Sequence, residues 1–462
     1  MIRGSRPAPE DRPPAATDRE PATARARWHG AAALRLFVLC FLVYNANCRT
    51  VPFSRGGDTI PTRLVPFALL AYGTPALDGF RSDFQKARLS TWYLRERRGS
   101  LVSFYPIGAP LAALPVYVPV YALLAIGGRP PSSLMFALSE QVEKLASSLL
   151  VALSVVMFYL TIRRRAGQRA AFGAALVFGV GSCMWAIASQ MLWQQTVVAV
   201  TLTAALWLLD WPDRPPWTAA AAGFALSLAA MSRLSAALLL AAGLCATLLA
   251  GGDRRQRVVR AVSYLGGALP LVLLGVAINL YYWGQPAAGY GTIPLVAASR
   301  AERLLGIAGL LVSPNRGLLV FTPIAALGIW GLLRQVAPGR ARDWMLIPFG
   351  VAALIHLLVM GSYPVWWGGW AFGPRYLVDV LPVLGLATFD VWSRLGDAGR
   401  RVAGVAIVCG VLVQVNGAFC FPASRWDWRS RDPSRDVWNV RDFELVEDFR
   451  AWLKAGRWST PY

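Results

Sequence analysis

Apolar stretches long enough to cross a lipid bilayer recur along most of this chain of 462 residues. Hydrophobic residues make up 56% of the chain and charged residues 15%, whereas soluble domains carry roughly a quarter charged residues. A helix that crosses a bilayer needs about 20 mainly apolar residues. We therefore predict an all-α polytopic membrane protein with about eleven or twelve transmembrane or re-entrant helices, and we exclude an ordinary soluble domain.

Arginine clusters predict how these helices are oriented, because cytoplasmic loops are enriched in Lys and Arg. Clusters that include Arg163, Arg254, Arg340 and Arg400 are all expected in the cytoplasm. The amino terminus then lies inside and the carboxyl tail outside. The net charge of +21 is explained by loops that face anionic lipid, and nucleic-acid binding is not expected. The predicted crossings are residues 31–48, 142–162, 170–188, 194–210, 217–231, 234–250, 260–283, 317–333, 343–361, 374–391 and 401–420.

This orientation requires that residues 106–128 do not cross the membrane. The stretch contains Pro106, Pro110, Pro115 and Pro119. Each proline removes a backbone donor and strains a helix, so a juxtamembrane or re-entrant segment on the outer face is favoured. A kinked crossing is the alternative, and it would place the downstream arginines on the opposite side.

The topology divides the chain into three parts. Residues 1–30, rich in Pro, Ala and Arg, are expected to form a disordered cytoplasmic arm ahead of an uncleaved first helix. Residues 31–421 form the transmembrane domain, in which residues 49–140 are a long outer loop with juxtamembrane helices. Residues 422–462 are expected to form an extracytoplasmic cap or interfacial segment. Three shorter outer loops are residues 189–193, 284–316 and 362–373.

Asp58 is the strongest candidate for a catalytic group. It lies in a short polar break of the first outer loop, directly after two glycines that allow a ligand to approach the backbone closely. An ionisable side chain at a membrane surface is often functional. The alternative is helix capping, in which Asp58 or Thr59 begins a helix with Pro61 in its first turn.

Other acidic residues of this loop have a plainer interpretation. Asp78, Asp83 and Glu96 lie among several basic residues. We expect them to form ion pairs on an amphipathic helix that lies on the membrane surface.

Arg316 and Arg375 are predicted to bind a phosphate. Each lies at the expected start of an outer-face helix, beside a proline. Unpaired N–H groups and the positive end of the dipole favour an anion there, and a guanidinium adds a bidentate contact. The alternatives are an ion pair between Arg375 and Asp379, one helical turn apart, and contact of Arg316 with lipid headgroups.

Further substrate-binding candidates are aromatic and polar residues that the topology places at the same face. They offer rings and hydrogen-bonding groups to a sugar or a lipid. Lys144 has the alternative of an ion pair with Glu140 on its own helix. These candidates are Tyr105, Tyr376, Trp193, Gln194, Asn315 and Lys144.

The chain resembles the integral-membrane C-type glycosyltransferases. The resemblance rests on Asp58 in a long first outer loop, on Tyr105 and Pro106 before a proline-rich stretch, and on arginines near the last outer loops. The branch it is most similar to contains bacterial protein O-mannosyltransferases and aminoarabinose transferases. Residues 311–318 and 367–376 resemble segments of uncharacterised bacterial members.

This resemblance implies a sugar donor linked to polyprenyl phosphate, with Asp58 as catalytic base of an inverting transfer at the outer face of the cytoplasmic membrane. The acceptor is a hydroxyl of a glycan, glycolipid or protein. Many relatives have an Asp-Glu pair where Thr59 follows Asp58, so we expect no metal site and no cofactor. Aminoarabinose-type relatives have a lysine where this chain has Tyr105, so that phosphate contact must come from elsewhere.

Two other classes of function remain open. A transporter or flippase of lipid-linked sugars is disfavoured because the predicted helix interiors contain few ionisable groups, mainly Arg233, His356 and Asp379. No internal repeat is visible, although many transporters contain one. The third class is another enzyme of lipid phosphates, such as a phosphotransferase or a glycan polymerase.

Overall fold

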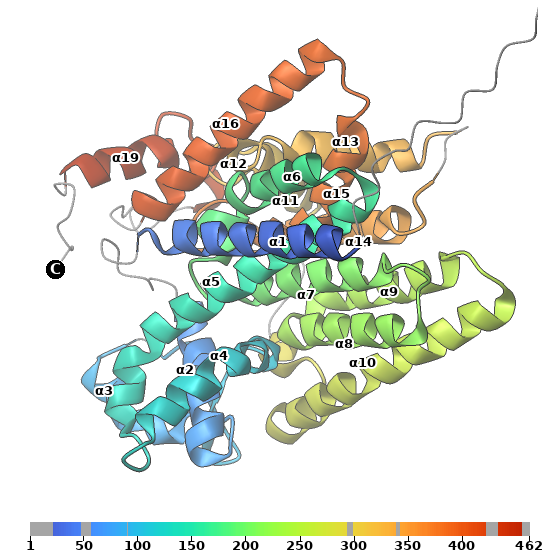
Figure 1. The fold of residues 1–462 in the computed structure, drawn as a ribbon. Coiled ribbons are helices and arrows are strands. Elements are labelled where there is room, and N and C mark those ends of the chain that lie inside the picture. The colour runs from blue at the N-terminus through green and yellow to red at the C-terminus, as the bar shows by residue number, and fades with distance from the viewer. Residues whose placement is uncertain are drawn as a thin grey trace, which may run out of the picture.

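The computed structural model describes residues 22–47, 57–89, 91–292, 299–338, 342–421 and 433–454. Within them the chain is almost entirely helical, which confirms the predicted all-α membrane fold (Figure 1). The predictions for residues 1–21, 48–56, 293–298, 422–432 and 455–462 and for Arg340 lie outside the described residues. Helix α1 begins at Ala22, within the stretch expected as an arm.

Helices occupy every predicted crossing. Those on α5, α10 and α16 are long and apolar enough to span a bilayer without a break. Two crossings are interrupted, since a π-helical turn (η3, Met184–Ala188) follows α6 and a break at Pro323 separates α12 from α13. The helices are α1 (Ala22–Asn45), α5 (Ser132–Arg165), α6 (Gln168–Val180), α7 (Gln194–Leu209), α8 (Pro216–Ser232), α9 (Ala237–Leu249, after the 3-10 turn η4, Leu234–Ala236), α10 (Arg254–Trp283), α12 (Leu318–Phe321), α13 (Ala325–Gln335), α14 (Leu346–Gly361), α15 (Leu381–Trp392, after the 3-10 turn η6, Arg375–Val380) and α16 (Asp397–Phe419).

Small residues set the closest helix packing. A Cβ atom on Gly223 of α8 would lie 2.1 Å from the carbonyl oxygen of Tyr264, and one on Gly267 of α10 would lie 1.9 Å from that of Ala220. Only glycine therefore allows α8 and α10 to approach this closely, as is usual for helices that pack within membranes.

The predicted first outer loop contains several short helices, which gather beside α5 (Figure 1). Helix α4 continues through Pro115 and Pro119 and packs against α2, α5 and α8. Whether it crosses the membrane stays a prediction. The elements of the loop are η1 (Gly57–Thr59), α2 (Ile60–Tyr72), η2 (Asp78–Phe80), α3 (Arg81–Lys86), β1 (Leu94–Arg97), β2 (Ser100–Ser103) and α4 (Gly108–Leu124).

One expectation for the loops is wrong. The surface helix expected near Glu96 is an antiparallel hairpin of β1 and β2, turned at Arg98 and Gly99 with φ of 51° and 77°. Arg81 nevertheless forms the expected kind of ion pairs, with Asp78 and Glu96. The predicted loop 284–316 contains the 3-10 turn η5 (Ala288–Thr292) and the helix α11 (Arg300–Val312). A capping box of Ser299 and Glu302 begins α11, a signal that the sequence already carried.

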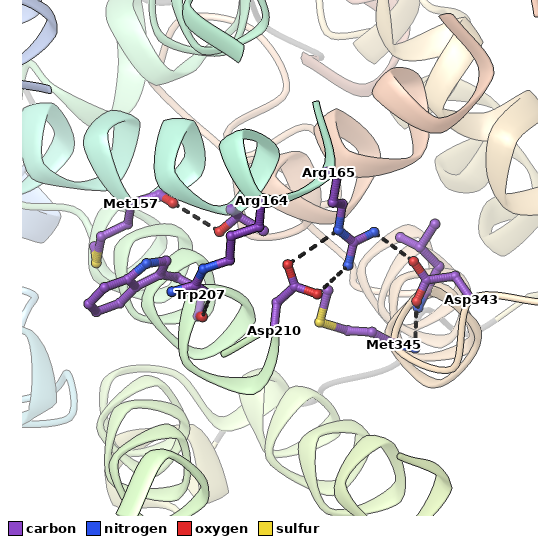
Figure 2. A network of polar contacts seen from close by, with 9 residues as sticks. Met157, Arg164, Arg165, Trp207, Asp210, Asp343 and Met345 are labelled. Carbon is purple, nitrogen blue, oxygen red and sulfur yellow. Dashed lines mark hydrogen bonds and ion pairs between the residues drawn. The ribbon is translucent and has the colours of Figure 1, made fainter. Parts of the chain in front are cut away.

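One face of the protein carries an ion-pair network built on an arginine cluster. Arg165, at the end of α5, contacts Asp210 at 2.9 Å and Asp343 at 2.6 Å (Figure 2). Asp210 follows α7 and Asp343 precedes α14, so three helix ends meet at this arginine-rich face. Arg214, just before α8, stacks on Trp344 beside the network.

The opposite face is reached along α7 and α8. Helix α7 runs from Gln194 to Leu209, about 24 Å at 1.5 Å per residue. Gln194 and the break at Arg233 after α8 therefore lie at the end away from the arginine-rich face. This arrangement agrees with the predicted topology, in which that far end is the outer face.

Candidate functional site

Asp58 lies in the turn η1, immediately before α2. The residue at the start of α2 is Thr59, and no side chain caps this helix, so the capping alternative for Asp58 is not what the structure contains. The turn is held from behind by Glu143 of α5, which hydrogen-bonds to Thr59 and accepts the backbone N–H of Leu192 at 2.9 Å. Arg63 of α2 lies 3.5 Å from Glu143. These contacts fix the position of the turn that carries Asp58.

The partner of Asp58 is Arg375. Asp58 Oδ2 lies 2.8 Å from Arg375 Nη2, and the side chains are 22% and 10% exposed. The alternative pairing of Arg375 with Asp379 does not occur in the structure. A carboxylate and a guanidinium separated by more than 300 residues in the sequence thus meet at the face opposite the arginine-rich one.

A glycine-rich loop wraps around Arg375. Gly368 and Gly369 adopt φ of 86° and 64°, which glycine tolerates and other residues rarely adopt. A Cβ atom on Gly368 would lie 3.1 Å from Cγ of Arg375. Arg375 begins a 3-10 turn instead of the predicted α-helix, and α15 starts only at Leu381, because Pro382 favours a helical first turn.

Aromatic rings flank the guanidinium of Arg375. Its central carbon lies 4.6 Å from the ring centroid of Trp193 and 5.3 Å from that of Tyr376. Such cation–π contacts hold a cation in place and contribute more when they are desolvated. Arg375 therefore contacts two other predicted site residues, Trp193 and Tyr376.

Two tyrosines extend the cluster. The hydroxyl of Tyr105 hydrogen-bonds to Asp58, and burial together with the Asp58 charge raises the pKa of Tyr105 well above its usual range. This hydroxyl therefore stays protonated and serves as a donor. Tyr290, in η5, was not predicted; its ring lies 6.3 Å from that of Tyr105, and its hydroxyl donates to Gln194 at 2.9 Å. The only sequence feature that could have indicated Tyr290 as a site residue was its position in a predicted outer loop.

Arg233 is the second unpredicted member of the cluster. It follows α8, contacts Asp379 Oδ2 at 2.6 Å and lies 4.8 Å from the ring centroid of Tyr376. His356 Nε2 lies 3.4 Å from the same oxygen and 2.8 Å from the carbonyl oxygen of Tyr376. Arg233, His356 and Asp379, the three ionisable residues expected inside helices, therefore form one buried group next to the turn that begins at Arg375.

Arg316 and Asn315 contact another part of the protein. The guanidinium of Arg316 is buried and pairs with Glu444 near the carboxyl terminus. The amide of Asn315 donates toward the carbonyl oxygens of Asp436, Asn439 and Asp442, and its oxygen accepts the backbone N–H of Glu444. These contacts attach the carboxyl-terminal segment, so the substrate-binding roles stay predictions.

We expect Asn315→Ala to loosen this attachment. It removes several hydrogen bonds from a buried site, each broken buried contact costing about 1–3 kcal/mol. Limited proteolysis of the membrane-embedded protein should then cleave the chain within residues 433–454 faster than in the wild type. Asn439→Ala, at an exposed position, is the matched control. Unchanged cleavage of Asn315→Ala would contradict the attachment.

Lys144 lies between helices away from the cluster. Its Nζ donates to the carbonyl oxygen of Tyr44 at 2.7 Å and to Gln190 Oε1 at 2.6 Å. Glu140, its expected helix partner, lies 3.5 Å from Arg63 instead. The substrate-binding role of Lys144 also stays a prediction.

Two further features of the described residues were compared with the cluster around Asp58. Within the described residues, no three His, Cys, Asp or Glu side chains gather as a metal ion would require. A cavity of about 320 Å³ between α5, α6, α15 and α16 is lined by apolar and hydroxyl side chains only. None of its lining residues belongs to the cluster around Asp58.

A central segment of the chain matches a protein family model. Residues 132–282 match the family described as dolichyl-phosphate-mannose-protein mannosyltransferase. The matched segment runs from α5 to α10 and includes Trp193, Gln194 and Arg233, whereas Asp58 and Arg375 lie outside it. No curated protein sequence matches the chain.

Three solved structures match over nearly the whole chain. ArnT from Cupriavidus metallidurans in the apo state is 16% identical, with 94% of this chain and 78% of that one covered and a TM-score of 0.48. The Archaeoglobus fulgidus oligosaccharyltransferase tethered with an acceptor peptide is 13% identical, with 90% and 59% covered and a TM-score of 0.52. AglB from Archaeoglobus fulgidus, in complex with an inhibitory peptide and a dolichol-phosphate, is 12% identical, with 93% and 64% covered and a TM-score of 0.51. The chain thus spans less than two thirds of the length of these archaeal proteins.

Proposed function

We propose that this chain, which has the fold of the integral-membrane C-type glycosyltransferases and a segment that matches a mannosyltransferase family model, moves a sugar from a polyprenyl-phosphate donor to an acceptor hydroxyl. The observation that carries the proposal is the contact of 2.8 Å between Asp58 and Arg375. A general base and a phosphate-binding cation are the two groups that such a transfer needs, and here they lie side by side.

Asp58 is the general base. The acceptor oxygen attacks the anomeric carbon of the sugar while its proton passes to the Asp58 carboxylate. The bond between that carbon and the phosphate oxygen breaks, so polyprenyl phosphate leaves with the bonding electrons and the configuration inverts. A positioned base of this kind accelerates a reaction by about a hundred- to ten-thousand-fold.

Arg375 binds the leaving phosphate. Its guanidinium can form two parallel hydrogen bonds to phosphate oxygens, and it stabilises the charge that grows on them. In the structure the same guanidinium forms an ion pair with Asp58. A phosphate that binds Arg375 in place of this carboxylate leaves Asp58 available to the acceptor hydroxyl, so donor binding and positioning of the base are coupled.

Arg233 stabilises the turn that carries Arg375. Its contacts with Asp379 and Tyr376 fix the turn that carries Arg375, and its charge adds to the positive potential where the phosphate binds. A second guanidinium was expected from Arg316, and Arg233 takes this role in the proposal. Breaking a buried ion pair costs about 3–5 kcal/mol, so the pair resists displacement.

The rings around Asp58 suit a sugar. Trp193 offers an apolar ring face, while Tyr105 and Tyr290 offer hydroxyl groups beside the carboxylate. The acceptor is a hydroxyl of a glycan, a glycolipid or a protein. We place the reaction at the outer surface of the cytoplasmic membrane, because the cluster lies opposite the arginine-rich face. The dolichol-phosphate bound to AglB supports a lipid-linked donor, and the acceptor peptide tethered to the oligosaccharyltransferase keeps a protein among the candidate acceptors.

A transfer assay tests the proposal. Purified protein in liposomes is supplied with radiolabelled sugars linked to polyprenyl phosphate, together with glycolipid, glycan and peptide acceptors. We expect one donor to lose its sugar to an acceptor with inverted configuration at the anomeric carbon. Movement of intact donor across the liposome membrane, without release of polyprenyl phosphate, would instead favour a flippase.

A further inference from the structure

The cavity between α5, α6, α15 and α16 has an apolar wall. Its volume is about 320 Å³, whereas an apolar cavity of about 150 Å³ in a soluble protein stays dry and binds benzene. Three hydroxyl groups line it, and the protein itself uses each of them. Those of Ser182 and Thr388 donate to backbone carbonyl oxygens four residues earlier, and that of Thr322 accepts the backbone N–H of Cys183 at 3.3 Å. The cavity therefore suits a hydrocarbon.

The length of the cavity matches one leaflet of a membrane. Its lining includes both ends of α15, Leu381 and Trp392, which lie about 16 Å apart at 1.5 Å per residue. The hydrocarbon core of a bilayer is about 30 Å thick, so one leaflet contributes about 15 Å. Gln335 donates to Asp390 of α15 at 3.4 Å and accepts the backbone N–H of Asp343 at 2.9 Å. The Trp392 end of the cavity therefore lies at the arginine-rich face.

The cavity opens between α6 and α16. Ala170 and Gly173 line it from α6 and are exposed, and a Cβ atom on Gly173 would meet nothing within 4 Å. Ile407 lines it from α16, a helix long and apolar enough to span a bilayer. Beside Ile407, Val405 and Val408 are exposed, as expected for a helix face that contacts lipid. A lipid chain can therefore enter from the membrane without passing through water.

Two arginines flank the cavity at the arginine-rich face. Arg169 directly precedes the lining residue Ala170, and Arg394 follows the lining residue Trp392 by two positions. Both arginines are exposed, and among the described residues neither forms an ion pair, whereas Arg165 pairs with two aspartates. Exposed arginines at a membrane surface reach anionic headgroups.

We propose that the cavity binds one acyl chain of an anionic phospholipid from the leaflet at the arginine-rich face, with its headgroup held by Arg169 and Arg394. The polyprenyl chain of the donor is the alternative occupant. Its phosphate is expected at Arg375, and the η6 residues between Arg375 and the lining residue Leu381 are all buried. A phospholipid matches the length of the cavity, its apolar wall and the charge at its open end.

Photolabelling of the full chain in liposomes tests this proposal. The probes are phosphatidylglycerol and phosphatidylcholine, each with a photoreactive diazirine midway along one acyl chain. Phe158 and Leu384 line the cavity and are 2% and 5% exposed, so label on them reports a chain inside the cavity and not one on the lipid-facing surface. We expect both residues to be labelled, and phosphatidylglycerol to label them several-fold more than phosphatidylcholine does.

Gly173→Phe is the variant that closes the opening, because its side chain enters open space and requires no shift of the backbone. Gly266→Phe on α10 is the matched control, since a Cβ atom there also meets nothing within 4 Å but the residue does not line the cavity. We expect Gly173→Phe to lower the labelling of Phe158 and Leu384 several-fold and Gly266→Phe to leave it unchanged.

A double variant, Arg169→Gln with Arg394→Gln, tests the headgroup contact. It should remove the preference for phosphatidylglycerol, and an unchanged preference would overturn the role of the two arginines. Wild-type protein without label on Phe158 and Leu384, or equal labelling in Gly173→Phe, would overturn the binding of a phospholipid chain. Labelling of both residues by a photoreactive polyprenyl phosphate that phosphatidylglycerol does not displace would overturn it in favour of the donor chain.

Discussion

Asp58→Asn is expected to lower the rate of sugar transfer by about a hundred- to ten-thousand-fold, the usual contribution of a general base. The amide has nearly the same shape as the carboxylate but cannot take the proton of the acceptor hydroxyl. Because Arg375 then has no carboxylate competing for it, binding of the donor phosphate should be unchanged or tighter. The measurement combines initial rates with the dissociation constant for the polyprenyl-phosphate donor.

Glu96→Gln is the matched control for this prediction. Glu96 belongs to the same outer loop and also pairs with an arginine, but its side chain is 59% exposed on the hairpin. Exposed ion pairs contribute little to stability, about 0–1 kcal/mol, so the control should retain activity. Full transfer by Asp58→Asn would remove Asp58 from the reaction.

Arg375→Lys is expected to lower the catalytic efficiency about ten- to a hundred-fold. Lysine keeps the charge but loses the planar fork that binds phosphate through two hydrogen bonds and that stacks on Trp193. Hydrogen bonds to charged groups contribute about 1.5–3 kcal/mol, which corresponds to this loss of rate. The measurement is kcat/KM with the donor as the varied substrate.

Arg316→Lys provides the contrast. Arg316 and Arg375 were both predicted from the sequence to bind phosphate, but Arg316 is buried against Glu444. Its substitution should lower the melting temperature while leaving kcat/KM per folded molecule close to that of the wild type. The reverse pattern, with Arg316→Lys inactive and Arg375→Lys active, would exchange the two residues in the proposed mechanism.

Some of this architecture was readable from the sequence because it depends on local patterns. The length of each apolar stretch and the arginine clusters between them indicated the helices, and every predicted crossing contains one. The resemblance to the C-type glycosyltransferases is confirmed by the family match and by the fold of the archaeal structures. Asp58 and Arg375 were both expected at the same membrane face, and packing brings them into contact there.

Other features were missed because they depend on pairing between distant segments. Arg233 and His356 looked isolated in the sequence, and Asp379 was considered only as a partner of Arg375. The packing of α8 and α14 around η6 joins the three residues. The hairpin of β1 and β2 was taken for a helix because its charged residues are compatible with either. Asn315 and Arg316 occupy a helix start that favours an anion, and the anion that Arg316 meets is the chain's own Glu444.

The amino-acid sequence by itself determined that this protein is a bundle of membrane helices with arginine clusters at helix ends, since the free energy of burying each side chain in lipid or water depends mainly on its own chemistry. Only the tertiary structure decided which charges are partners. A buried arginine requires an acceptor for its charge. The packing of segments that lie hundreds of residues apart determines which acceptor is within reach. Arg375 therefore meets Asp58, Arg233 meets Asp379, and Arg316 holds the carboxyl-terminal helix in place.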